Sequence, residues 1–251
     1  MPGFESGQSH EHNPMSTTKK VAIVTGASQG IGAALAQAFR QRGYLLVAVA
    51  RSMPASEDPD VLAVSGDLSQ PGTGARIVEQ TMARFGRIDT LVNNAGVYVE
   101  KPFTDYTDAD YNLMTGVNLR GFFDVTRAAI PAMLAGGDGG HVVCVSTSLV
   151  DRANARIPAA LASLTKGGLV AVTRELAIEY AARGIRANAV SLGVIRTPMN
   201  PDSPGGELAA LHPLGRMGEI DDVVEAIMYL EQAPFVTGEI LHVDGGQSAG
   251  F

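Results

Sequence analysis

The sequence predicts a doubly wound parallel α/β sheet with helices on both faces, a three-layer α/β/α architecture, on three observations. Apolar runs of strand length alternate with helical periodicity from Lys20 onward. These runs are continuous rather than alternating, which is typical of strands buried on both faces. Neither a repeat nor a linker interrupts them, so one domain over residues 20–251 is expected.

Each expected strand is a short run rich in Val, Leu, Ile and Ala, and each expected helix is a longer stretch with apolar residues three or four apart. The strands are VAIVTG (21–26), LLVAVA (45–50), VLAVSGD (61–67), IDTLVNNAG (88–96), GHVVCVST (140–147), IRANAVS (185–191) and GEILHVDGG (238–246). The helices lie near 31–42, 72–85, 107–135, 159–183 and 221–232.

Composition excludes several kinds of partner. The formal net charge is −7 and no basic block occurs, so neither nucleic acid nor an anionic membrane is an expected partner. The longest apolar runs, such as YLLVAVA at 44–50, are too short to span a bilayer. Cys144 is the single cysteine, which excludes an internal disulfide and suits a reducing, cytoplasmic compartment. Its apolar neighbours predict an inert, buried thiol.

Residues 1–19 are expected to form a disordered leader, either native or added by cloning. The segment is polar and has neither the apolar core nor the cleavage site of a secretory signal. Met15 could be the natural start. His10 and His12 lie in this leader, and no group of residues has metal-ligand spacing, so no metal is expected.

The first strand leads into TGASQGIG (25–32), the turn that carries the cofactor prediction. Gly26 permits a tight turn, Gly30 lets the backbone approach a pyrophosphate, and Gly32 lets the following helix pack on the sheet. The start of that helix offers free N–H groups and a partial positive charge to phosphates. The turn therefore predicts a Rossmann-type dinucleotide site, with a glycine-rich turn without a ligand as the alternative. The intervening residues expected at the cofactor are Ser28, Gln29 and Ile31.

The connection from Arg51 to Asp67 is too short for a helical crossover. Its last residues are needed for the third strand, and Pro54 and Pro59 interrupt helical hydrogen bonding in the remainder. We expect a loop there, which leaves one face of the sheet thinly covered.

The order of several motifs resembles the short-chain dehydrogenase/reductase family over residues 20–250. The motifs are TGASQGIG, NNAG (93–96), Asn118 in GVNLRGFF, STS (146–148), Lys166, GVIRTPM (193–199) and VDGG (243–246). The resemblance implies hydride transfer between a nicotinamide cofactor and a small-molecule substrate. It also implies further cofactor-binding residues. These are Asp67 and Leu68 at the adenine, Asn94, Ala95 and Gly96 after the fourth strand, Lys166 at the ribose, and Gly193, Ile195 and Thr197 near the nicotinamide. Asn93, together with Ala95 and Gly96, is expected to line the groove at the end of the fourth strand and to stabilise the switch point of the sheet. The family's usual Pro-Gly is Leu192-Gly193 here, so this loop is expected to be less rigid.

The end of the second strand favours NADP(H). An acidic residue there would hold the ribose hydroxyls of NAD(H), but this chain has Ala50 followed by Arg51. A guanidinium suits a 2′-phosphate. If Arg51 only stacks on the adenine, NAD(H) remains possible.

The resemblance also implies the catalytic residues Asn118, Ser148 and Lys166, but the position of the family's proton-donating tyrosine falls on Ala162. No tyrosine occurs between Tyr111 and Tyr180, and the apolar stripe of the helix leaves little freedom to shift the register. Three interpretations stay open. Tyr98 could supply the proton, the substrate could be an imine or quinone that needs no strong acid, or the protein could be a catalytically weak or inactive NADP(H)-binding sensor or scaffold.

Three smaller expectations follow. Ser146 and Ser148 should share one face of the strand end while Thr147 points away, and the spacing favours Ser148 as the catalytic hydroxyl. His212 lies in the segment that covers the substrate in the family, where it could contact substrate, but as a loop histidine it is expected to be solvated. The helices near 107–135 and 159–183 are apolar over a wide arc, which predicts a homotetramer or homodimer.

Overall fold

The computed structural model describes residues 19–201 and 206–250, and it contains one parallel sheet of seven strands in the order β3-β2-β1-β4-β5-β6-β7. Strands β2 and β3 therefore lie on one side of β1 and strands β4 to β7 on the other, as the doubly wound prediction requires. The strands are β1 (Val21–Thr25), β2 (Leu45–Ala50), β3 (Val61–Ser65), β4 (Thr90–Asn93), β5 (Gly140–Thr147), β6 (Ile185–Leu192) and β7 (Ile240–Val243).

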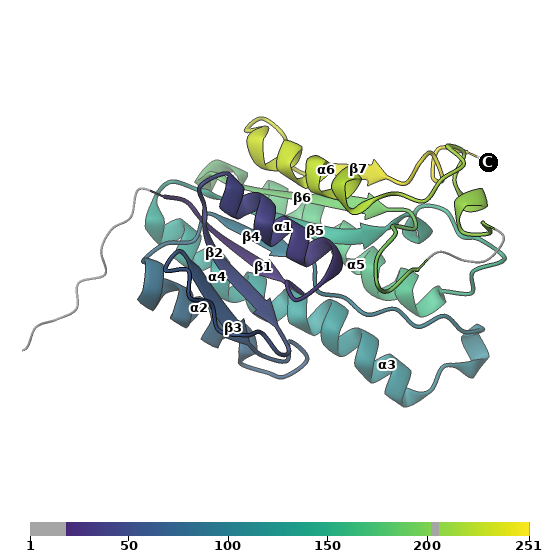
Figure 1. The fold of residues 1–251 in the computed structure, drawn as a ribbon, viewed down its shortest axis with the longest axis horizontal. Helices are drawn as coiled ribbons and strands as arrows, with labels where there is room; N and C mark the ends of the chain where they lie inside the picture. The colour runs from purple at the N-terminus through teal and green to yellow at the C-terminus, as the bar shows by residue number, and fades with distance from the viewer. Residues whose placement is uncertain (1–18, 202–205, 251) are drawn as a thin grey trace, which may run out of the picture.

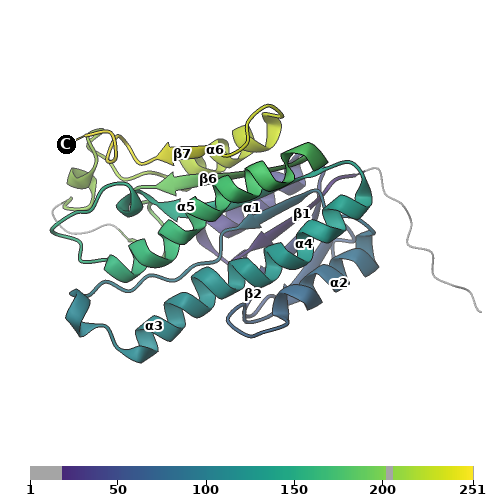
Figure 2. The same ribbon diagram turned by 180° about the vertical axis from the view of Figure 1, so that it is seen from behind.

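Helices cover both faces of the sheet. In Figure 1, α1 and α6 lie in front of it, and Figure 2 shows α2, α4 and α5 on the opposite face. The expected three-layer fold is confirmed. The helices are α1 (Gly30–Gln41), α2 (Thr73–Phe85), α3 (Asp108–Met114), α4 (Phe122–Gly136), α5 (Ala160–Tyr180) and α6 (Ile220–Gln232).

The core is split by the sheet into two apolar layers. Residues of β1 alternate between them: Val21 and Ile23 pack with α2, α4 and α5, whereas Ala22 and Val24 pack with α1 and α6. All four are fully buried, which explains why the strand is apolar at every position. Cys144 of β5 is buried in the first layer, and burial raises the pKa of its thiol to about 11, as expected for an inert core cysteine.

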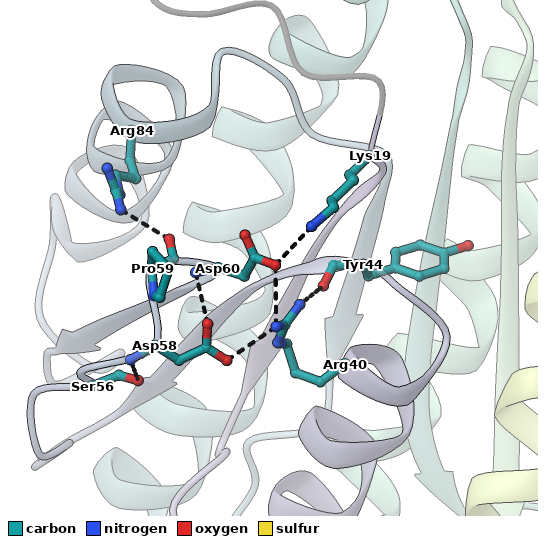
Figure 3. Close-up of polar contacts among 8 residues, drawn as sticks. All are labelled: Lys19, Arg40, Tyr44, Ser56, Asp58, Pro59, Asp60 and Arg84. Carbon is teal, nitrogen blue, oxygen red and sulfur yellow. Dashed lines mark hydrogen bonds and ion pairs between the residues drawn. The ribbon is translucent and has the colours of Figure 1, made fainter.

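The connection between β2 and β3 is the loop that the sequence predicts: residues 51–60, all described, contain no helix. Polar contacts hold its second half to the neighbouring helices (Figure 3). Arg40 of α1 contacts the carboxylates of Asp58 and Asp60 at 3.0 and 3.2 Å, and Arg84 of α2 donates a hydrogen bond to the Pro59 carbonyl at 2.8 Å. The first three residues of β3, the edge strand, are only half-buried.

The expected disordered leader lies outside the described residues except for Lys19. The Lys19 ammonium contacts the Asp60 carboxylate at 2.8 Å (Figure 3). The salt bridge joins the start of the described chain to the same β2–β3 loop.

A buried polar network ties α6 to the sheet at the amino end of the strands. The Glu231 carboxylate accepts hydrogen bonds from Tyr44, Thr90 and His141 at 2.7 to 2.9 Å. Asn188 donates to the other ring nitrogen of His141 at 3.0 Å. Burial lowers the pKa of His141, so the ring is neutral and donates its Nδ1 proton to Glu231.

The long helix expected near 107–135 is interrupted by a π-helical segment, Thr115–Gly121, between α3 and α4. Such segments widen one turn of a helix and are frequent at functional sites. Asn118 lies in the middle of this one and is buried.

Across residues 19–201 and 206–250, no helix combines the length and apolar character needed to cross a bilayer. The same residues contain no cluster of His, Cys, Asp and Glu that could hold a metal ion.

Candidate functional site

A cavity of about 900 Å³ lies at the carboxyl ends of the central strands. Ligands of doubly wound sheets bind at this edge, beside the point where the strand order reverses. All sixteen residues predicted to bind the cofactor line it. They are Gly26, Ser28, Gln29, Gly30, Ile31, Gly32, Arg51, Asp67, Leu68, Asn94, Ala95, Gly96, Lys166, Gly193, Ile195 and Thr197.

The glycine turn between β1 and α1 has the geometry that each glycine was predicted to serve. Gly26 and Gly30 have φ values of +70° and +56°, a region that L-residues with a side chain rarely adopt. A Cβ atom on Gly32 would overlap the carbonyl oxygen of Gly26, so only glycine lets α1 approach the turn this closely. These backbone requirements fit a pyrophosphate-binding turn that feeds a helix.

The side chain of Asn94 fixes this turn to the end of β4. Its Nδ2 donates to the carbonyl of Thr25 at 2.9 Å, and the Thr25 hydroxyl accepts hydrogen bonds from the backbone N–H groups of Asn94 and Ala95 at 3.1 Å. The expectation that Asn93 lines the groove is wrong: it is not a cavity residue, and its Nδ2 donates to Thr126 of α4 at 3.0 Å. Asn93 is the last residue of β4 and Asn94 directly follows it, and the two side chains bind different partners.

The adenine end carries one positive and one negative side chain. Asp67 accepts hydrogen bonds from the backbone N–H and the hydroxyl of Ser69, at 2.9 and 2.8 Å, and these bonds lower the pKa of the Asp67 carboxyl. The nearby Arg51 guanidinium lowers it further. Arg51 is exposed at the cavity edge, so its guanidinium is free to meet an anionic group of a ligand.

Lys166 and Ala162 occupy successive turns of α5 and both line the cavity. The Lys166 ammonium donates a hydrogen bond to the Val145 carbonyl at 2.7 Å. Desolvation lowers the pKa of this half-buried lysine to about 8. Ala162 is 2% exposed and belongs to a small apolar cluster with Met114 and Leu161.

Asn118 is held beside the cavity but does not line it. Its Oδ1 accepts from the Val97 N–H at 2.9 Å, and its Nδ2 donates to the Val97 carbonyl and the Thr165 hydroxyl at 3.0 and 3.1 Å. The side-chain amide therefore connects the segment after β4 to α5. Sequence reasoning identified the residue but not these partners.

The Ser148 hydroxyl donates to Oε1 of Gln247 at 2.9 Å, and both residues are buried. A hydroxyl can donate only one proton in a hydrogen bond, and Ser148 donates it to Gln247. A substrate oxygen would need the same proton. Ser146 donates to the Lys166 carbonyl at 3.3 Å, whereas Thr147 is half-buried and also lines the cavity. Gln247 lies 99 residues from Ser148, and no local pattern in the sequence indicates the contact.

Tyr98, the candidate replacement acid, lines the cavity and is 38% exposed. Its hydroxyl donates to the Glu100 carboxylate at 3.0 Å. Burial and this carboxylate raise the pKa of the phenol, which makes Tyr98 a weaker proton donor than an ordinary tyrosine.

His212 is buried rather than solvated, so the sequence-based expectation is wrong. The ring is 3% exposed, and its Nε2 accepts a hydrogen bond from the Val194 N–H at 2.9 Å. A Cβ atom on Gly193 would lie 2.7 Å from the same nitrogen. His212 therefore packs against the Leu192–Gly193 loop and restricts its backbone. This contact takes the place of the restriction that the family's usual proline would supply.

Comparison with known proteins identifies the family to which this chain belongs. A family model described as enoyl-(acyl carrier protein) reductase matches residues 26–248. The chain is 35% identical over 252 residues to oxidoreductase UcpA of Escherichia coli O157:H7, covering 92% of this chain and 95% of that protein.

Two solved structures share the fold over 91% of this chain and 98% of their own, each at 33% identity. One is the 3-ketoacyl-(acyl-carrier-protein) reductase of Brucella melitensis complexed with NADH, with a TM-score of 0.84. The other is a blue fluorescent protein from a metagenomic library in complex with NADPH, with a TM-score of 0.82.

Proposed function

The chain belongs to the short-chain dehydrogenase/reductase family, and from this premise we propose that it is an NADP(H)-dependent oxidoreductase acting on a small organic substrate. The observation that carries the proposal is the single cavity lined by all sixteen predicted cofactor residues, with a glycine turn that tolerates no side chain at Gly32. The turn and the start of α1 would hold the pyrophosphate, Arg51 and Asp67 the adenosine end, and Lys166 the nicotinamide ribose. When bound, the reduced cofactor supplies a hydride.

The preference for NADP(H) over NAD(H) is assigned to Arg51. We expect Arg51→Ala to weaken NADPH binding by about tenfold, because a charge-assisted hydrogen bond contributes about 1.5–3 kcal/mol and this guanidinium is exposed. NADH binding should change much less, since NADH has no 2′-phosphate. The measurement is titration of nucleotide fluorescence with both cofactors.

Arg42→Ala is the matched control for that measurement. Arg42 is an exposed arginine that caps the carboxyl end of α1, whereas the glycine turn lies at the amino end. Its guanidinium donates to the Ala38 carbonyl. It should leave both affinities unchanged. Equal losses of NADPH and NADH affinity in Arg51→Ala would remove the basis for the NADP(H) preference.

We further propose that the site lacks the phenolic proton donor of the family, because Ala162 occupies the turn of α5 before Lys166. This favours acceptors that need little or no protonation. An iminium becomes a neutral amine on receiving a hydride, and a quinone becomes a weakly basic phenolate. A panel of ketones, imines and quinones, followed by the loss of NADPH absorbance, tests the oxidoreductase proposal.

The second candidate is a catalytically weak or inactive NADP(H)-binding protein, favoured by the same Ala162. The panel separates the two: tight NADPH binding with no turnover of any acceptor supports the sensor or scaffold function. A chain that binds neither NADPH nor NADH would contradict both.

We propose a homotetramer or homodimer that uses α4 and α5. These helices cover the same face of the sheet (Figure 2), and they expose Phe123, Leu164 and Ile178 by 52%, 60% and 81%. Sedimentation velocity should give a mass of two or four chains, and Ile178→Asp should reduce it. Gln80→Asp, on the exposed side of α2, should not. A monomeric wild type would contradict the proposal.

A further inference from the structure

We infer that the ammonium group of Lys166 itself donates the proton to the substrate oxygen, through the space that Ala162 leaves open. The inference rests on the proposed oxidoreductase function and names the acid of that site. It makes Lys166 the proton donor itself, in addition to its role in holding the cofactor ribose.

The geometry of α5 leaves the lysine without an intervening side chain. Residues four apart on a helix lie on the same face, so Ala162 and Lys166 are neighbours there, and both line the cavity. Ala162 presents only a methyl group to the cavity at this turn, and the Ser163 hydroxyl is bonded to the Leu149 carbonyl. On the other side, a Cβ atom on Gly96 would lie 2.9 Å from Nζ, so the glycine makes room for the ammonium beside the strand end.

The hydrogen bonds of the ammonium leave protons available. An ammonium group has three N–H donors. Within the described part of the chain, the one acceptor bonded to Nζ is the Val145 carbonyl, at 2.7 Å. The Asn118 amide, which like Nζ lies close to Gly96, is bonded to Val97 and Thr165. When the cofactor ribose takes a second N–H group, the third remains for water or a substrate in the cavity.

The surroundings of Lys166 also make it an effective acid near neutral pH. Among the described residues no carboxylate acts to stabilise the charged form, and desolvation lowers the pKa of Lys166 to about 8. The titratable group that acts on Lys166 is the Cys144 thiol of β5, and its own raised pKa keeps it neutral. Apart from Arg51 and Asp67 at the adenine end, the other ionisable side chains that line the cavity are Tyr98, Glu100, Arg156 and Glu207. General acids work best with a pKa near the working pH.

The proton transfer balances without a further reactant. When a hydride reaches the carbonyl carbon, the π electron pair of the C=O bond moves to oxygen. The new O–H bond forms as one Nζ–H bond of Lys166 breaks, and the nitrogen keeps that electron pair. The carbonyl compound is reduced, the nicotinamide is oxidised, and the neutral amine regains a proton from water.

The first test measures the pKa of Lys166 directly. The chain has four lysines, Lys19, Lys20, Lys101 and Lys166, so NMR of protein labelled with [6-¹³C]lysine gives a spectrum simple enough to assign. The resonance lost in Lys166→Arg belongs to Lys166, and we expect it to titrate near pH 8. Titration above pH 10, in the range of an ordinary lysine, would overturn the inference.

The second test is the pH dependence of ketone reduction. The acid form of Lys166 is present below its pKa, so kcat should be constant below about pH 8 and fall tenfold for each pH unit above it. Lys166→Arg keeps the positive charge but cannot release a proton in this range. The variant should lose at least tenfold more activity with a ketone than with a quinone, and in this ratio any effect on cofactor binding cancels.

Each remaining outcome decides the question. Equal losses with ketone and quinone, a kcat independent of pH from 6 to 10, or a loss in Tyr98→Phe as large as in Lys166→Arg would overturn the inference. A wild type that binds NADPH but reduces no ketone would also overturn it. A wild type that fails to bind NADPH contradicts the proposed function instead, and nucleotide fluorescence detects that result independently.

Discussion

The Ala162→Tyr variant is expected to reduce simple ketones about a hundredfold faster than the wild type. A positioned general acid contributes roughly 10²–10⁴ in rate, and the gain should fall at the low end because Lys166 already supplies a proton. The new phenol would lie one turn from the Lys166 ammonium, and that charge would lower the pKa of the phenol. Steady-state rates with a ketone panel, at a pH of about 7, measure the gain.

The control for Ala162→Tyr is Ala162→Phe, which adds the same ring without the hydroxyl. Ala162 packs with Met114 and Leu161, so either ring has to enter the cavity and could disturb this cluster. Thermal unfolding of both variants reports that cost. If the two variants have the same ketone activity, the hydroxyl does nothing and the rest of the site is not arranged for a phenolic donor.

Gly32→Ala is expected to weaken NADPH binding by a hundredfold or more and to destabilise the fold. The added Cβ would overlap the Gly26 carbonyl oxygen and would lie 2.6 Å from Nδ2 of Asn94. Backbone atoms cannot rotate away, so the turn and α1 would have to separate. Overpacking of this kind costs about 1–3 kcal/mol, and a chain of this length loses about 2–4 °C in Tm for each kcal/mol. Fluorescence titration and thermal unfolding measure the two effects.

Gly136→Ala provides the comparison for Gly32→Ala. Gly136 is also helical, at the end of α4, and an added Cβ would meet no atom within 4 Å. It should leave NADPH affinity unchanged and raise stability slightly, because alanine favours the helix. Wild-type NADPH affinity in Gly32→Ala would show that the cofactor does not depend on the close approach of α1 to the turn.

Elements set by local pattern were predictable from the sequence. The seven strands, the glycine turn and the loop after β2 follow from apolar runs, glycine spacing and two prolines. The cofactor residues come from strand ends, which a parallel sheet brings to one edge whatever the details of packing. For this reason all sixteen lie around one cavity.

Features that depend on contacts distant in sequence were not predictable. The burial of His212 depends on Gly193 and Val194, which a separate loop brings beneath the ring. The partner of Ser148 is Gln247, at the far end of the chain. The contacts that hold the β2–β3 loop come from side chains of α1 and α2, which are distant in sequence from the loop residues they bind. In each case the local sequence pattern predicted the kind of segment in which the residue lies. It carried no information about the distant residue that it contacts.

The π-helical segment Thr115–Gly121 sets the direction of two residues of the site, Asn118 within it and Leu113 in the helix before it. Successive residues of a regular helix differ by about 100° in direction, so removing one residue from this segment would turn Asn118 away from Val97 and Thr165. The same deletion would rotate α3 and move Leu113, which lines the cavity. Insertions and deletions here therefore offer evolution a route to reshape substrate selectivity while the nucleotide-binding half keeps its geometry.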